Sequence, residues 1–289
     1  MRNLAPVRAA FGARQHEVDD AADEAQAPWP VAPSAVAASP HHGFARGARA
    51  GSFLHEQLAW LAEQDFADDA PTHAAFTQRC VRLGWGEHAD AAWHWLRRVL
   101  HTPLPPLGAA LRGLRSRLAE MEFWFPADAA SAATLDHACA RRWLGGREHA
   151  PLDERRLLGL VMGFADLVFE HDGRYWVLDY KSNALGERDA DYHADALADA
   201  VAAHRYDVQA MLYLLALHRQ LRARLGRSYD PARQLGGAIC LFLRGIDGPA
   251  RGCFTMPADM AWLDEFDRLL TPSLEARADC GGEPGEEGG

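Results

Sequence analysis

Two strand-like segments joined by a tight turn constrain the fold of this chain more than any other feature of its sequence. Residues 159–170 and 174–181 are both largely apolar, and between them stands the pair Asp172-Gly173, a typical signal for a β-hairpin. A continuous apolar run over 237–243 follows later, as expected of a buried central strand. The sequence therefore predicts a sheet that contains these three strands.

Segments with helical periodicity surround these strands. Ser52 is a candidate N-cap for a helix in which Phe53, Leu54, Leu58 and Leu61 recur at helical spacing. Further helices are predicted over 73–83, 88–100, 131–144, 190–202 and 204–225, and a further strand over 118–125. This order of elements predicts an α/β fold, with a mixed sheet flanked by helices and extra helices on the N-terminal side.

The two ends of the chain differ in composition from the part between them. Residues 1–47 are rich in Ala, Pro, Asp and Glu without sustained periodicity, which is typical of a flexible linker. Residues 276–289 are rich in Gly and Glu and are predicted to form a disordered tail. The folded domain is therefore expected over residues 48–275.

The overall composition narrows the classes of function. The net charge of −10 gives no global basic signal, so a DNA-acting chain would need a local arginine patch, metal ions or a partner that delivers the strand. The five cysteines are scattered and form no C-x-x-C pair, which argues against disulfides or a zinc site and for a cytoplasmic protein. The N-terminal residues lack the apolar core and cleavage site of a signal peptide, and no run approaches roughly 18 apolar residues, so no membrane partner is expected.

Lys181 is the only lysine in the chain, because 29 of its 30 basic residues are arginine. This bias suggests that arginine replaces lysine wherever arginine serves. A lysine that remains is then a candidate for a role that needs a compact ammonium group. The alternative is chance. The single lysine also excludes a P-loop of the form G-x-x-x-x-G-K-[ST], so the chain has no nucleotide site of that type.

Asp179 and Lys181 project side by side from the strand 174–181, because alternate side chains of a strand share a face. Asp166, on the preceding strand, faces them only if the two strands pair with a suitable stagger. Two neighbouring carboxylates repel each other unless a cation lies between them, and hard oxygen ligands suit Mg²⁺. A lysine beside them can stabilise charge on a phosphate. The alternative is a structural Asp–Lys ion pair. On this pattern Tyr175 and Val177 lie on the face of Asp179, and Trp176, Leu178 and Tyr180 lie on the other.

Four further polar residues carry less information when each is taken alone. His55 lies on the first predicted helix, where a single histidine is more often a surface or core residue than a ligand, and Glu122 lies on the strand 118–125. Gln209 and Tyr213 stand four residues apart on one helix and therefore share a face. Both can hydrogen-bond to DNA or support a site, although such pairs are common on ordinary helices. Arginines at 205, 219, 222, 224 and 227 give this helix a basic flank, read as a solvated face.

Taken together, these residues resemble the signature of the RecB-type branch of the PD-(D/E)xK nucleases. The signature runs through Gly163-Phe164-Ala165-Asp166, then Asp179-Tyr180-Lys181, then Gln209-x-x-x-Tyr213. The similarity extends in order over about residues 40–275. This whole stretch resembles the C-terminal nuclease domain of the RecB proteins, the beta subunits of exodeoxyribonuclease V. The further blocks that carry it are Gly-Ser-Phe-Leu-His at 51–55, Met-Glu-Phe at 121–123, Tyr-Lys-Ser-Asn at 180–183, Ala-His-Arg-Tyr-Asp at 203–207 and Leu-Phe-Leu-Arg-Gly at 241–245.

This resemblance implies a restriction-endonuclease-like core and a role for each candidate residue. It implies that His55, Asp166 and Asp179 are metal ligands, together with the backbone carbonyl of Tyr180, and that Mg²⁺ is the cofactor, with Mn²⁺ as the alternative. Lys181 becomes the catalytic lysine, acting with Asp166 and Asp179. Gln209 and Tyr213 are implied to lie beside the site and to help hold DNA or the catalytic groups, and Glu122 is a supporting residue.

The resemblance also implies a larger machine. RecB proteins carry a helicase before the nuclease domain, so the expected partners are single-stranded DNA ends, a RecB-type helicase part and RecC- and RecD-like subunits. A RecA-type recombinase is a further expected partner. The leading hypothesis is metal-dependent hydrolysis of DNA ends in double-strand-break repair and recombination. The alternatives are a truncated module that docks a recombinase or partner subunit without cleaving DNA, and a metallohydrolase of another fold with Asp166 and Asp179 far apart.

Overall fold

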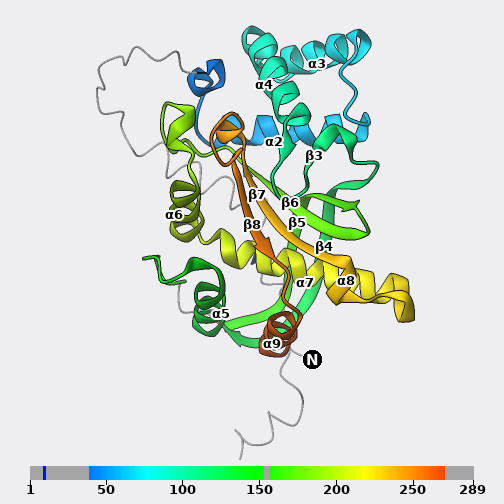
Figure 1. The fold of residues 1–289 in the computed structure, drawn as a ribbon, viewed down its shortest axis with the longest axis vertical. Helices are drawn as coiled ribbons and strands as arrows, with labels where there is room; N and C mark the ends of the chain where they lie inside the picture. Colours follow the sequence, from blue (N-terminus) through cyan, green and yellow to red (C-terminus); the bar gives the residue numbers. More distant parts are fainter. Residues whose placement is uncertain (1–8, 11–38, 153–155, 271–289) are drawn as a thin grey trace, which may run out of the picture.

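One mixed sheet of six strands forms the centre of the domain, with helices on both of its faces (Figure 1). The computed structural model describes residues 9–10, 39–152 and 156–270. The α/β architecture expected from the sequence is confirmed, as are the extra helices on the N-terminal side. Within the described residues, no helix is long and apolar enough to cross a bilayer. The strands are β1 (Ala9–Ala10), β4 (Ser116–Ser131), β5 (Arg156–His171), β6 (Arg174–Lys181), β7 (Leu235–Phe242) and β8 (Cys253–Pro257).

The predicted hairpin is the β5–β6 pair. Asp172 and Gly173 both have positive φ angles, 50° and 74°, as a two-residue hairpin turn requires. The strands pair antiparallel from His171 opposite Arg174 to Leu167 opposite Leu178. β4 pairs antiparallel with β5, while β6 pairs in parallel with β7, whose other neighbour is the antiparallel β8. β7 is buried along its whole length, as the apolar run over 237–243 predicts.

The two faces of the sheet pack against different sets of helices and so form two cores. Val177 faces a core built with the helices that follow β4 in the sequence. Leu178 and Tyr180 face a second core built with the N-terminal helices. The alternation predicted for strand 174–181 is therefore confirmed. The first set is α5 (Ala132–Cys139), α6 (Ala194–His204), α7 (Tyr206–Leu225) and α9 (Met260–Leu270), and the second is α2 (Ala48–Glu63), α3 (Ala70–Arg82) and α4 (Ala89–His101).

The side chains of β4 and β5 change the core that they face at one position in each strand, Glu120 in β4 and Asp166 in β5. Ala119 packs against the second core, whereas Met121, two residues later, lies in the first. On β5, Leu167 and Ala165 change sides in the same way. Glu120 has a φ of 48°, which places it outside the β region and breaks the alternation there. Beyond this switch the outward face of β4 and β5 is exposed, with large apolar side chains at Trp124, Leu160 and Phe164.

Several element boundaries differ from the sequence-based expectation. Ser52 is not the N-cap of its helix, because α2 begins at Ala48 after Gly47. The segment predicted as a helix over 131–144 is α-helical only to Cys139 and continues as a π-helical turn. Strand β8 and helix α9 were not among the predicted elements.

The predicted linker and tail lie mostly outside the described residues, including the whole of 276–289. Two parts of the predicted linker are described: Ala9–Ala10, which pairs with β5 as strand β1, and residues 39–47, which pack on the domain. The short 3₁₀ helix Pro40–Gly43 carries the buried His41 and His42, and Phe44 joins the second core. The folded domain therefore includes residues before 48.

Candidate active site

Asp166 stands where β5 and β6 part. The last backbone pair of the hairpin is Leu167 with Leu178. Beyond this pair, the Tyr180 backbone N–H donates to Asp166 Oδ2 at 2.7 Å. A side-chain carboxylate thus takes the place of the next backbone acceptor on β5. The register of the hairpin brings Asp166 to the level of Asp179, and this hydrogen bond holds the Asp166 carboxylate there. Burial is the main cause of the raised pKa of the Asp179 carboxyl, and the charge of Asp166 raises this pKa further.

His55 approaches Asp166 from the face of the sheet that packs against the N-terminal helices. It lies on α2, and its Nδ1 is 3.2 Å from Asp166 Oδ1. The edge of its ring contacts the ring of Tyr180, with centroids 5.9 Å apart. Burial lowers the pKa of His55, but the charge and hydrogen bond of Asp166 together with the charge of Asp179 outweigh burial and raise the pKa above its usual value. The structure thus places His55 against an acid 111 positions away in sequence.

Asp179 and Lys181 form a buried ion pair at the end of β6. Lys181 Nζ lies 2.5 Å from Asp179 Oδ2, and the two side chains are only 2% and 6% exposed. Burial raises the pKa of Asp179 to about 6, even though the charge of Lys181 acts to lower it. Burial therefore disfavours the charged form of Asp179, and the ammonium of Lys181 offsets only part of the free energy of desolvation.

The Lys181 ammonium is fixed by helix α7 as well as by Asp179. Lys181 Nζ donates to Gln209 Oε1 at 2.7 Å, and Gln209 Nε2 donates to the Tyr213 hydroxyl at 2.8 Å. Gln209 and Tyr213 are both buried, so the pair predicted to share a helix face points into the site. Burial raises the pKa of Tyr213 well above its usual value, which keeps the hydroxyl neutral.

Asp179 Oδ1 is the atom that best fits a cation. It is buried and has no hydrogen-bond partner among the described residues. An unpaired buried carboxylate oxygen is costly unless a positive charge satisfies it. Together with Asp166 and His55 it gives a hard-oxygen set with one imidazole, which suits a small divalent cation. The donor chemistry of these residues therefore suits a divalent metal ion.

For two of the predicted site residues, Tyr180 and Glu122, the described contacts do not test the predicted role. Tyr180 pairs with Leu241 in the β6–β7 ladder, and its side chain packs in the second core; the role of its carbonyl stays a prediction. Glu122 is exposed on β4 opposite Phe164, outside the buried cluster, so its supporting role also stays a prediction.

Tyr206 and Asn183 are site residues that were not singled out from the sequence. Lys181 Nζ lies 3.6 Å from the centre of the Tyr206 ring, within cation–π distance. The Tyr206 hydroxyl donates to Asn183 Oδ1 at 2.9 Å, which fixes the ring. Both residues stand in blocks that carry the family resemblance, 203–207 and 180–183, and that was the available signal.

Comparison with known proteins agrees with this geometry. Residues 34–253 match the profile of the PD-(D/E)XK nuclease superfamily. The RecBCD enzyme subunit RecB of Escherichia coli (strain K12) is 40% identical over 236 residues, covering 79% of this chain and 20% of that protein. The same subunit of Haemophilus influenzae is 38% identical over 237 residues, 78% of this chain and 18% of that protein. That of Mycobacterium tuberculosis (strain H37Rv) is 35% identical over 264 residues, 79% and 24% respectively. The chain therefore spans about a fifth of the length of these relatives.

Proposed function

The chain belongs to the PD-(D/E)XK nuclease superfamily, and we propose that it is a metal-dependent DNA nuclease of the RecB type that hydrolyses phosphodiester bonds at single-stranded DNA ends. The observation that carries this proposal is the cluster of buried and half-buried side chains where β5 and β6 part. There His55 contacts Asp166, and Asp179 pairs with Lys181. Nucleases of this superfamily use divalent metal ions, and we propose Mg²⁺, with Mn²⁺ as the alternative.

The proposed mechanism divides the work among the residues of this cluster. The side chains of His55, Asp166 and Asp179 and the carbonyl of Tyr180 are the proposed metal ligands. A divalent cation bound there would lower the pKa of a water molecule and polarise a phosphate oxygen. Lys181 stabilises the negative charge that builds up on the phosphate. Its ammonium is already oriented by Gln209 and Tyr206, so it needs little reorganisation during the reaction.

The exposed outward face of β4 and β5 is the proposed path of the DNA strand. Phe164, two residues before Asp166, is 37% exposed, and Trp124 is 67% exposed. Every nucleobase has a π face, so exposed aromatic rings bind single strands by stacking with little sequence preference. The bases would stack on Trp124 and Phe164 while the scissile phosphate lies at Asp166. Glu122 stands on this same face, opposite Phe164.

Partners are proposed to deliver that strand. The relatives are named as subunits of the RecBCD enzyme, and this chain corresponds to about a fifth of their length. We propose that it acts as the nuclease part of such an assembly in double-strand-break repair and recombination, with RecC- and RecD-like subunits and a RecB-type helicase part. Delivery by partners would offset the repulsion between DNA and a chain of net charge −10. A RecA-type recombinase is a further proposed partner.

A cleavage assay with matched aspartate variants tests the proposal. The purified chain is incubated with end-labelled linear and circular single-stranded DNA, with Mg²⁺ or with a chelator. We expect Mg²⁺-dependent release of short oligonucleotides. Asp179→Asn should reduce cleavage at least 100-fold, because it removes a charge that holds the metal. Asp172→Asn, in the turn of the same hairpin, should cleave normally.

The pattern of results separates the proposal from its competitor. Full activity of Asp179→Asn, or activity that persists in the chelator, would show that the cluster does not carry the chemistry. No cleavage by the unmodified chain, combined with capture of a RecA-type recombinase in a pull-down, would favour the non-cleaving docking module. Circular dichroism of each variant establishes that the fold is retained.

A further inference from the structure

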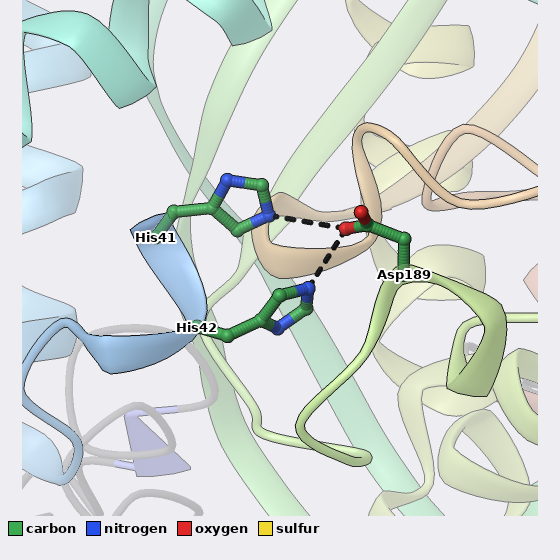
Figure 2. A group of neighbouring side chains, drawn as sticks. All are labelled: His41, His42 and Asp189. Atoms are coloured by element: carbon green, nitrogen blue, oxygen red, sulfur yellow. Dashed lines mark hydrogen bonds and ion pairs between the residues drawn. The ribbon is translucent and has the colours of Figure 1, made fainter. Parts of the chain in front are cut away.

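His41, His42 and Asp189, which share no residue with the site described above, form a second cluster (Figure 2). His41 and His42 lie on the short 3₁₀ helix Pro40–Gly43, and Asp189 lies on the loop that leads from β6 to α6. His42 Nε2 is 2.8 Å and His41 Nε2 is 3.6 Å from the same oxygen, Asp189 Oδ1. Figure 2 shows both rings turned toward this carboxylate. Among the described residues, this trio of ligand types has all three ligand atoms within 4.8 Å of one another.

The surrounding structure holds each of the three groups in this position. Both histidines are buried, and His41 stacks on the ring of Trp95 at 5.5 Å. Arg244 fixes the backbone that carries them, since its guanidinium donates to the carbonyls of residues 41, 42, 44 and 45. The Ser39 hydroxyl donates to Asp189 Oδ2 at 2.6 Å, which leaves Oδ1 directed at the rings. The convergence is therefore built by contacts outside the trio.

The donor set identifies the class of ion that would suit this cluster. Two imidazole nitrogens and one carboxylate oxygen favour a transition-metal dication such as Zn²⁺, whereas ligand sets dominated by oxygen atoms suit Mg²⁺. Asp189 is 31% exposed on its side chain, so the cluster is open to solvent on one side for entry and for a water ligand. To bind a metal, His41 Nε2 must give up its hydrogen bond to the Arg244 carbonyl, at 3.0 Å.

We propose that His41, His42 and Asp189 bind one zinc-class dication, distinct from the catalytic metal. The ion joins residues 40–43, which precede α2, to the loop that follows the strand of Asp179 and Lys181. This inference does not rest on the proposed nuclease activity, because it concerns different residues and a different ion.

The proposed ion would stiffen the loop that supports the catalytic lysine. Tyr192, which ends the turn carrying Asp189, packs on the His42 ring with centroids 5.5 Å apart. Its hydroxyl accepts from the Leu185 backbone N–H at 3.2 Å. Asn183, on the same loop, accepts from the Tyr206 hydroxyl, and the Tyr206 ring contacts Lys181 Nζ. A metal that fixes Asp189 therefore limits the motion of the segment between Lys181 and α6.

Metal content and thermal unfolding test this site without reference to DNA cleavage. The full chain carrying Asp179→Asn, which weakens the catalytic metal site, is loaded with Zn²⁺ or Co²⁺, dialysed and measured by elemental analysis. We expect one equivalent to be retained, with the visible absorption of four-coordinate Co²⁺ bound by nitrogen and oxygen. Zn²⁺ should raise the unfolding midpoint by several degrees, because an ion that binds only the folded state stabilises it.

Substitutions of the three ligands decide the outcome. His42→Gln, and separately Asp189→Asn, should lose the retained equivalent and the shift of the midpoint, whereas His94→Gln, at an exposed histidine, should keep both. The Asp189 variant keeps an oxygen that can accept from Ser39, so it tests the ligand if the histidine variant fails to fold. Retention of less than half an equivalent, or equal retention by the Asp189→Asn and His94→Gln chains, would overturn the proposal.

Discussion

Replacing Lys181 by methionine tests whether the buried pair with Asp179 holds a charge that nothing else neutralises. Nζ lies 2.5 Å from Asp179 Oδ2, and neither side chain is more than 6% exposed. Methionine is unbranched and flexible and fills similar space without the charge. Breaking a buried pair from one side costs about 3–5 kcal/mol, because the remaining charge is left buried and unpaired. We expect Lys181→Met to lower the free energy of unfolding by about 3 kcal/mol at pH 8.

The loss should depend on pH in a defined direction. Burial already raises the pKa of Asp179 to about 6, above the value of about 3.9 for an unfolded chain. Without Lys181 this pKa rises further. A carboxyl whose pKa is raised by folding stabilises the fold while it is protonated, and the stabilisation is lost as the pH rises through the folded pKa. The deficit of Lys181→Met should therefore be smaller at pH 5 than at pH 8.

Urea unfolding followed by circular dichroism, in a chelator and without DNA, measures this deficit. The slope against urea should stay unchanged, so that the shift in midpoint reports stability alone. The double variant Asp179→Asn with Lys181→Met should lose less than the sum of the two single variants, because neither charge is then left alone. A deficit below about 1 kcal/mol at pH 8, a deficit independent of pH, or strict additivity would refute the reasoning.

Two further predictions concern the DNA path and a second buried ion cluster. Trp124→Ala in the Asp179→Asn background should weaken binding of a labelled single-stranded oligonucleotide roughly 5- to 150-fold, since stacking contributes about 1–3 kcal/mol per base. Leu83→Ala, at another exposed apolar residue, should leave the affinity unchanged. Equal affinities of the two variants in anisotropy titrations would remove Trp124 from the proposed DNA path. Arg205→Met should lower stability by about 3–5 kcal/mol in urea unfolding, because Arg205 pairs with the buried Asp136 and Asp207, and a loss under 1 kcal/mol would contradict that account.

The hairpin explains why the positions of two acids could be read from the sequence. A two-residue Asp-Gly turn makes His171 face Arg174, and each step away from the turn adds one residue on both strands. The same count brings Asp166 to the level of Asp179, without any knowledge of the rest of the fold. The stagger that brings Asp166 and Asp179 together was therefore already implied by the turn. Local turn chemistry determined the register, and tertiary packing only had to accept it.

The exchange of faces at Glu120 and Asp166 could not be read in the same way. Alternation with a period of two assumes an unbroken strand, and residues 118–125 satisfy it by composition. The break depends on one residue, Glu120, taking a positive φ, which glutamate does rarely and which leaves no mark on the apolar pattern. Because of this break, the side chains of β4 and β5 that point outward beyond Asp166 are not those that continuous alternation predicts.

His41 and His42 were missed for a different physical reason. The segment before them is rich in Pro and Ala and has no periodicity, so its local signal is that of a linker. The burial of His41 and His42 comes from contacts that span about 150 to 200 residues, to Asp189 and to Arg244. Such contacts depend on where β7 and the loop after β6 end, and no property of residues 39–47 indicates that position. Sequence reading is weakest where a short segment is held entirely by distant partners.

The surroundings of Lys181 give a physical reason for the only lysine in the chain. Its Nζ lies within 2.5 Å of Asp179, 2.7 Å of Gln209 and 3.6 Å of the centre of the Tyr206 ring. An ammonium group directs three donors from one atom and can meet a carboxylate, an amide oxygen and a ring face at once. A guanidinium is planar and wider, and directs its donors in a fixed fork. In a space that leaves the side chain 2% exposed, an arginine would have to displace Gln209 or Tyr206. Arginine serves at the 29 other basic positions of this chain, and at the buried Arg244 its wider guanidinium spreads its donors over several backbone carbonyls instead of directing them from one atom.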